Sequence, residues 1–352
     1  MSSQGQQDLD TDIEAWRRLY AAADRIKKLA PWAWMWEADI FGVQFPGTAE
    51  VGYVSVMGAN GQHFAVSAYL GDAALYGFWA LEAADEDTDS ADQVLEIPQL
   101  MASFEDRAML DDKDRDIIRA LGLRYRGRNA WPLFRSYRPG FRPWFLEQAE
   151  VEKLTLALDQ LTGVAMRFED DPALLHEHAE REVLVRVAQP SDTAQDWADE
   201  LRQVPVPEPI RIESRIRTSE LDRLTSLPRD SRTAEVDLFI GPGAVAQPGE
   251  RPSFAYALMA VESESHYVLG IELLQALDGL PRMWAEVPAK LVELLNKAGF
   301  FPSELRTTSS RLHGLLAPVA QDRLGIPVTL HKHLPALAEA KEAMWDWGAE
   351  RG

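Results

Sequence analysis

Residues 233–352 alternate between strand and helix signals in an order that few folds can accommodate. Apolar runs rich in Val, Ile, Phe and Leu predict strands, and helical periodicity predicts helices. The predicted elements are, in order, strands 235–240, 254–262 and 267–274, helix 283–298, strand 304–308, helix 310–324, strand 326–331 and helix 335–347. A β-β-β-α-β-α-β-α order predicts a mixed α/β domain whose later strands are parallel and joined by right-handed crossovers.

This order resembles the ribonuclease H-like fold of integrases and nucleases. In that family, carboxylates from the first strand, from the end of the fourth strand and from the last helix bind two divalent metals. Asp237 stands in the first strand and Glu339 and Glu342 stand on the last helix, but residues 307–309 read Thr-Thr-Ser. Because two-metal chemistry needs at least three converging oxygens, the resemblance implies a degenerate ribonuclease H-like fold, with Asp237 as a weak candidate metal ligand.

The N-terminal part of the chain predicts an α+β domain with an antiparallel sheet. An Asn-Gly pair at 60–61 separates two of the strand signals and is typical of a hairpin. The predicted elements are helix 11–29, strands 40–45, 51–57 and 63–70, helix 73–83, helix 149–162 closed by Gly163, and strand 182–188. Five prolines between 189 and 232 indicate a linker with short helices, so the predicted domains are 1–188 and 233–352.

Charge is unevenly distributed along this chain, whose formal net charge is −20. Residues 82–114 hold twelve acids and two bases, whereas residues 117–146 hold seven arginines and no acid. A chain of this charge is repelled by phosphate backbones and anionic lipid unless positive charge is concentrated locally. The arginine stretch is such a concentration.

The arginine stretch is interleaved with aromatic residues, which makes it the leading candidate for a binding surface. Guanidinium groups bind phosphate or carboxylate in bidentate fashion, and aromatic rings can stack on bases. The candidate binding residues are Arg124, Arg126, Arg128, Arg135, Arg138, Arg142, Trp131 and Trp144. The alternative is that the aromatic residues are core and the arginines pair with the acids of residues 82–114.

Histidine and tryptophan patterns give weaker candidates. His176 and His178, and His331 and His333, form His-x-His pairs that could share a metal on a strand, although exposed or capping histidines are commoner. Alternating tryptophans at 32, 34 and 36 could form a ligand platform on an extended segment, but a place in the core is the favoured interpretation.

Other catalytic and cofactor motifs are absent from the sequence. There is no Walker loop, no dinucleotide fingerprint, no Gly-x-Ser-x-Gly elbow and no His-Glu-x-x-His. The chain has no cysteine, which fits a reducing compartment. We therefore predict no cofactor, no metal, and no membrane partner. A polar N-terminus without a basic residue and the lack of a long apolar run predict a cytoplasmic location.

Several short motifs together resemble an uncharacterised bacterial two-domain family of unknown function. The N-terminal motifs are PWAWM at 31–35, FGVQ at 41–44, SVMG at 55–58, AYLG at 68–71 and PGFRPW at 139–144, and the C-terminal ones are VLG at 268–270 and LPAL at 334–337. The resemblance implies a bacterial source, and it transfers no activity and no site residue.

Three hypotheses about function follow. The leading one is a non-enzymatic binding protein whose arginine and aromatic surface takes a nucleic acid or an acidic protein. The second is a metal-dependent nucleic-acid-processing enzyme built on Asp237. The third is a small-molecule enzyme with a site between the domains, lined by residues 32–36.

Overall fold

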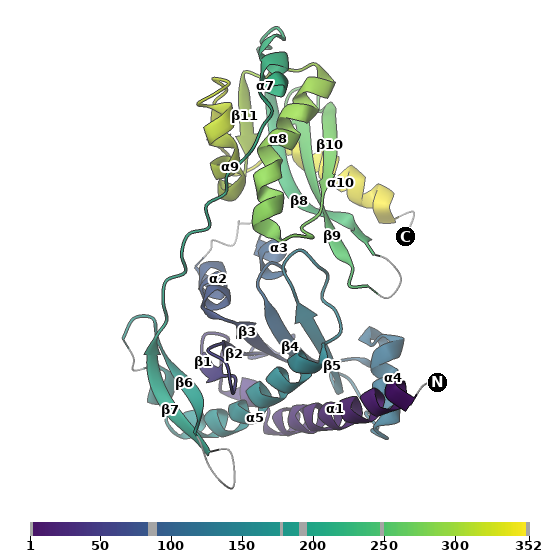
Figure 1. The fold of residues 1–352 in the computed structure, drawn as a ribbon, viewed down its shortest axis with the longest axis vertical. Coiled ribbons are helices and arrows are strands. Elements are labelled where there is room, and N and C mark those ends of the chain that lie inside the picture. The colour runs from purple at the N-terminus through teal and green to yellow at the C-terminus, as the bar shows by residue number, and fades with distance from the viewer. Residues whose placement is uncertain (1–2, 84–89, 177–178, 190–195, 247–249, 350–352) are drawn as a thin grey trace. The chain divides into compact units, whose positions relative to one another are not determined.

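The computed structural model describes residues 3–83, 90–176, 179–189, 196–246 and 250–349 (Figure 1). The chain divides into two compact units, which we call unit 1 and unit 2. Unit 1 comprises Met1–Ala84, Ile97–Arg138 and Pro143–Pro207, and unit 2 comprises Asp85–Glu96, Pro139–Arg142 and Glu208–Gly352. Two upstream segments therefore belong with the C-terminal part of the chain.

Unit 1 is built on a seven-stranded sheet of order β5-β4-β3-β2-β1-β6-β7. Its strands are β1 (Phe41–Gln44), β2 (Val51–Met57), β3 (Ala65–Leu70), β4 (Gln99–Glu105), β5 (Trp131–Tyr137), β6 (Glu182–Gln189) and β7 (Asp196–Gln203). The predicted antiparallel sheet needs one correction, because β1 and β6 pair in parallel. The reason is that a long helix precedes β6 and returns the chain in the same direction, as crossover connections do.

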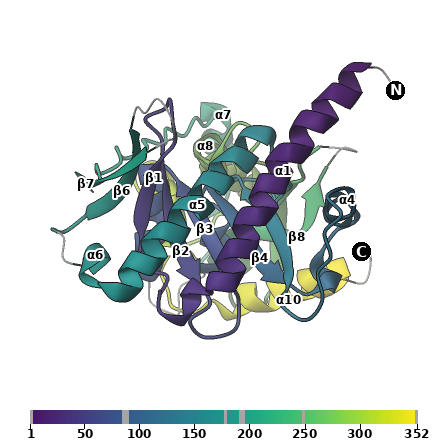
Figure 2. The ribbon, with the colours of Figure 1, turned by 90° about the horizontal axis from the view of Figure 1, so that it is seen from below.

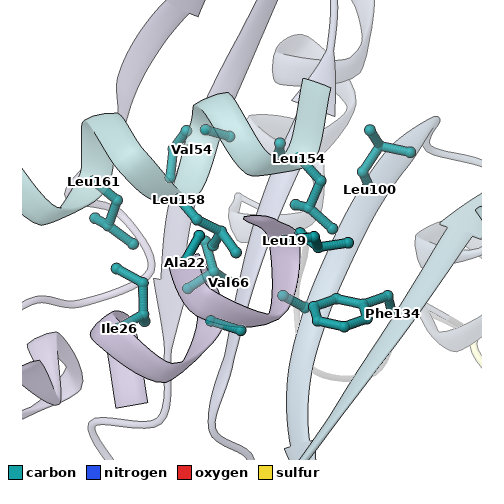
Figure 3. Packing of buried hydrophobic residues seen from close by; sticks show 14 of the residues in the cluster. Leu19, Ala22, Ile26, Val54, Val66, Leu100, Phe134, Leu154, Leu158 and Leu161 are labelled. Carbon is teal, nitrogen blue, oxygen red and sulfur yellow. The ribbon is translucent and has the colours of Figure 1, made fainter. Parts of the chain in front are cut away.

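Helices cover both faces of this sheet. They are α1 (Ser3–Leu29), α2 (Asp72–Glu82), α4 (Asp112–Ala120), α5 (Gln148–Asp170) and α6 (Ala173–His176), with 3₁₀ turns η1 (Pro31–Ala33) and η2 (Arg107–Met109). Figure 2 shows α1 and α5 side by side across one face. Leu19 and Ile26 of α1 meet Leu154 and Leu158 of α5 over the sheet residue Val66, and all five are fully buried (Figure 3).

Helix α5 continues beyond the predicted stop at Gly163. Glu147 and Glu150 form a capping box at its start. Buried apolar residues continue past the glycine, among them Val164, Ala165 and Phe168, and the helix ends at Asp170. Burial of this apolar stripe outweighs the low helix propensity of one glycine, so Gly163 lies within the helix.

Unit 2 is built on a five-stranded sheet of order β10-β9-β8-β11-β12. Its elements are α3 (Ser90–Val94), α7 (Thr218–Thr225), β8 (Thr233–Val245), β9 (Ser253–Glu262), β10 (Val268–Leu274), α8 (Leu280–Ala298), β11 (Glu304–Thr307), α9 (Ser310–Ala320), β12 (Val328–Leu330) and α10 (Pro335–Ala349). Strands β8, β9 and β10 are antiparallel, while β8, β11 and β12 are parallel. From β8 onwards the elements follow the order expected from the sequence.

Strand β9 lies at the centre of the unit 2 core, because all of its residues are buried. Tyr256 and Leu258 belong to a cluster formed with α8 and α9, and Ala257 and Met259 belong to a cluster formed with α10. Alternate residues of a strand point to opposite faces of the sheet. Helices α8 and α9 therefore cover one face of this sheet and α10 covers the other.

Residues 189–232, the predicted linker, include strand β7 and helix α7. Strand β7 pairs with β6 along its whole length, from Glu182 opposite Gln203 to Gln189 opposite Asp196.

The part of the chain that the structure describes contains no helix long and apolar enough to cross a membrane.

Candidate anion-binding pocket

A cavity of about 310 Å³ in unit 1 gathers arginine side chains from three elements. Its lining residues are Arg107, Arg115, Ile118, Arg119, Leu123, Arg124, Tyr125, Arg126 and Trp131. They come from η2, from α4, from the loop that follows α4 and from the first residue of β5. We call this cavity the arginine pocket.

Local sequence signals hold these elements in place. Helix α4 begins at a capping box formed by Asp111 and Asp114. Arg115 and Arg119 are four residues apart and so lie on one face of the helix. In the loop that follows, Gly127 and Asn129 have positive φ angles of 99° and 50°, which Gly and Asn tolerate best. The Asn129 amide donates a hydrogen bond of 2.8 Å to Asp106, which ties the loop to the chain just before η2.

Two of the five arginines in the pocket are paired with acids on their own helix. Arg115 donates to Asp112 at 2.6 Å and to the Leu110 carbonyl, and Arg119 donates to Asp116 at 2.6 Å. Such pairs, three residues apart at a surface, are weak and leave the arginine able to bind another anion.

The other three arginines have no acidic partner within 4 Å among the residues that the structure describes. Arg124 and Arg126 are exposed in the loop after α4. The guanidinium of Arg107 lies 5.9 Å from the ring centroid of Trp131, in a cation–π contact. The arginine pocket therefore has an excess of positive charge in a chain whose net charge is −20.

The aromatic side of the pocket is formed by Tyr125 and Trp131, whose ring centroids are 5.9 Å apart. Tyr125 stacks on Tyr20 of α1 and donates a hydrogen bond of 3.3 Å to Asp24. Burial raises the pKa of Tyr125, and the nearby negative charge of Asp24 raises the pKa further. The phenol therefore stays neutral and adds no negative charge to the arginine pocket.

Of the eight candidate residues predicted from the sequence, Arg124, Arg126 and Trp131 line the arginine pocket. Arg128 lies in the same loop with 93% of its side chain exposed, 3.9 Å from Asp106. The other four candidates do not join the pocket.

Arg135 has a structural role. Its side chain is only 13% exposed and lies 2.8 Å from both Asp111 and Asp114, and the latter is 8% exposed. These bonds join β5 to the start of α4. Here an arginine pairs with acids of residues 82–114, as in the alternative interpretation of the basic stretch.

The remaining candidates lie elsewhere for similar reasons. Arg138 pairs with Glu147 at 2.9 Å. Arg142 belongs to unit 2, where its backbone amide donates to the Pro252 carbonyl at 2.8 Å. Trp144 exchanges backbone hydrogen bonds with Ser136 and packs edge-on against Phe145. The predicted binding surface is therefore not a single surface, because burial and pairing separate residues that are adjacent in sequence.

Sequence reasoning missed Arg107 and Arg115, and it placed Arg119 and Tyr125 in the arginine stretch without choosing them as candidate binding residues. Arg107 stands among the acids of residues 82–114, so its neighbours in the sequence indicate an acidic surface and not a basic one. The spacing of Arg115 and Arg119 is a helix-face signal that could have identified them as neighbours.

Asp237 is buried in unit 2 and forms an ion pair with Lys341 of α10. The ammonium group of Lys341 also lies 4.4 Å from the ring centroid of Phe239, and Asp237 accepts a hydrogen bond of 2.8 Å from the Leu238 amide. No group of three metal-ligating side chains occurs in the described residues. The ammonium group of Lys341 therefore lies beside Asp237, where a metal ion bound by this carboxylate would have to lie.

His176, His331, Trp32 and Trp34 have local partners, whereas His333 is exposed and Trp36 is 59% exposed. His176 lies 2.6 Å from Asp39, and His331 lies 3.0 Å from Thr329, while His178 is outside the described residues. Trp32 does not lie on an extended segment, as a ligand platform would require. It lies in the 3₁₀ turn η1 and packs against the main core of unit 1. Trp34 packs against the same core and donates to the Ala165 carbonyl at 3.0 Å.

The fold and the pocket define a two-unit α/β protein with a strongly basic pocket in its first unit. Comparison with family models gives two matches. Residues 16–186 match a domain of unknown function (DUF7309), and residues 220–345 match a second domain of unknown function (DUF6930). The chain therefore belongs to an uncharacterised two-domain family of unknown function, which confirms the family predicted from its motifs. Neither the curated proteins nor the solved structures gave a match.

Proposed function

We propose that the protein acts by binding rather than by catalysis, and that the arginine pocket binds the phosphate groups of a single-stranded nucleic acid. The observation that carries this proposal is the convergence of five arginines with Tyr125 and Trp131 in one concave site. Guanidinium forks suit phosphate oxygens, and aromatic rings beside them suit unpaired bases.

The negative charge of the rest of the chain favours binding in a local concave site and disfavours binding along an extended basic surface. With a net charge of −20, most of the molecule repels a polyanion. A cavity of about 310 Å³ is at the small end of ligand sites and admits a nucleotide or two. We therefore expect the arginine pocket to bind a short stretch of single-stranded nucleic acid and not to bind a long duplex.

Binding of fluorescently labelled oligonucleotides, followed by polarisation, tests the proposal. A single-stranded RNA should bind, and its affinity should fall as salt rises from about 50 to about 200 mM, because bound phosphates release counterions. The double variant Arg124→Ala/Arg126→Ala should lower the affinity by tenfold or more and reduce the salt slope by about two. Arg142→Ala is the matched control, since this arginine is exposed and lies outside the arginine pocket.

Two outcomes would contradict the proposal. One is an affinity that the double variant leaves unchanged. The other is tighter binding of a poly-glutamate peptide than of RNA at equal charge, which would identify an acidic protein as the partner.

For unit 2 we propose a degenerate ribonuclease H-like domain that has lost metal chemistry. The support is the β10-β9-β8-β11-β12 strand order together with Lys341, whose charge stands beside Asp237. We also propose a cytoplasmic location, which agrees with a chain that has no cysteine.

A further inference from the structure

Unit 2 contains a short acidic segment that comes from far upstream in the chain. Residues 85–96 belong to unit 2, although the rest of this unit begins at Pro139. The segment contributes α3, a helix of five residues, and a following turn in which the amides of Leu95 and Glu96 bond to the carbonyls of Asp92 and Gln93.

Three side chains of this segment contact the rest of unit 2, one from α3 and two from the turn that follows it. Asp92 accepts a hydrogen bond of 3.0 Å from the backbone amide of Ile240 in β8. Leu95 packs against the hydrophobic cluster formed by α8, α9 and the sheet. Glu96 accepts a hydrogen bond of 2.6 Å from Arg311 of α9, and its side chain is only 10% exposed.

The groups of unit 2 that these three side chains contact lie at the carboxyl ends of parallel strands. Strand β11 ends at Thr307, after pairing with Thr233–Glu235, whereas β8 continues to Val245. The β8 edge near Ile240 therefore extends past β11. In open α/β sheets, ligands bind beyond the carboxyl ends of the strands, where neighbouring connections diverge in opposite directions.

Arg311 is positioned for an anionic partner. It stands in the first turn of α9, whose N-terminus is capped by Ser309, and the helix dipole there favours negative charge. Its guanidinium also lies 4.4 Å from the ring centroid of Trp284 of α8, which restricts its movement.

The internal segment leaves this site incompletely satisfied. Tyr256 is only 3% exposed. Its buried hydroxyl has no hydrogen-bond partner among the described residues. Burial raises the pKa of Tyr256, and the charges of Glu96 and Asp92 raise the pKa further. A buried hydroxyl without a partner is costly, so the internal segment is held less tightly than it would be if every group in the site were paired.

We propose that unit 2 carries a binding site for a short acidic peptide of the pattern Asp-x-x-Leu-Glu, which Asp92, Leu95 and Glu96 occupy within the chain. A partner protein that presents the same pattern replaces the internal segment. This site is separate from the arginine pocket, and the inference does not rest on the function proposed for unit 1.

The experiment uses the full-length protein and a labelled peptide with the sequence of residues 90–98. The variant Asp92→Asn/Leu95→Ser/Glu96→Gln frees the site by weakening the internal segment. The peptide should bind this variant at least about tenfold more tightly than the unaltered chain, because a tethered competitor acts at a high effective concentration. Addition of Arg311→Glu to the variant should abolish binding, and a peptide carrying Glu96→Arg should restore it.

Three results would overturn the proposal. The first is a folded variant, with a cooperative thermal transition by circular dichroism, that does not bind the peptide. The second is equal affinity for the variant and the unaltered chain, which would place the peptide elsewhere. The third is loss of the unfolding transition of unit 2 in the variant, which would make the segment an integral part of the fold.

Discussion

Arginines that are neighbours in this sequence differ in their roles because their burial and their partners differ. Arg135 is held between two carboxylates, one of them buried, whereas Arg138 forms an exposed pair. Removing one member of a buried pair leaves the other charge without compensation, while exposed pairs contribute little.

Replacing Arg135 by Ala is therefore expected to lower the free energy of unfolding of unit 1 by about 3 kcal/mol, because Asp114 stays buried without its partner. The matched variant Arg138→Ala should cost at most about 1 kcal/mol, since this pair is exposed to solvent. Urea denaturation followed by tryptophan fluorescence measures both values. Similar losses for the two variants would contradict the structural role of Arg135.

Asp199 of β7 provides a prediction about pH. Burial raises the pKa of Asp199, but hydrogen bonds from Arg167 and Arg186 outweigh this and lower the pKa below its usual 3.8. A lowered carboxyl pKa stabilises the folded state above pH 3.8, and that stabilisation is lost as the pH falls through the folded pKa. Asp199→Asn should therefore be less stable than the unaltered chain at pH 7, with the difference disappearing as the pH falls through the folded-state pKa of Asp199. A difference that is constant with pH would exclude this electrostatic origin.

A continuous apolar run could be predicted as a strand from the sequence, whereas strands of mixed pattern such as β4 and β5 could not. Strand β9 is a continuous apolar run and was found within one residue of its observed bounds. Strand β5 was missed, because Pro132 within it is unusual in strands. Proline is tolerated there because β5 is at the edge of its sheet, so the tertiary context decides its conformation.

The candidate site was predictable only in part for the same reason. Arg124, Arg126 and Trp131 stand together in a conspicuous stretch, but Arg107 is seventeen residues upstream of Arg124. These residues lie together only because η2, α4 and the loop after α4 pack beside the start of β5. No local pattern encodes that arrangement.

Helix α5 gives a prediction at the scale of an element. Gly163 has an ordinary helical conformation, and a Cβ atom added there would meet nothing within 4 Å. Gly163→Ala should therefore stabilise unit 1 by about 1 kcal/mol, since alanine loses less backbone freedom in a helix. Thermal unfolding by circular dichroism should show a higher midpoint. The matched control is Gly299→Ala at the end of α8, where φ is 62° and the same change should destabilise.

At the scale of the whole molecule, each unit has hydrophobic clusters of its own. Leu158 is fully buried in unit 1 and Leu258 is fully buried in unit 2. Truncation of either to Ala should cost about 3 kcal/mol through lost burial and the cavity that remains. Hydrogen exchange read by mass spectrometry should show faster exchange in the unit that carries the substitution. Equal acceleration in both units after one substitution would contradict separate cores.

The parallel pair of β1 and β6 has a consequence for how unit 1 is made. Strand β1 ends at Gln44, and its partner β6 begins only at Glu182. During synthesis, β1 to β5 can assemble as a sheet while β1 still has a free edge. A ribosome adds about 5–20 residues per second, so this edge stays open for several seconds or more. An unpaired edge strand is a place where chains associate wrongly. A chain truncated before Glu182 should thus depend on chaperones far more than the complete one, and its yield in soluble form would report that dependence.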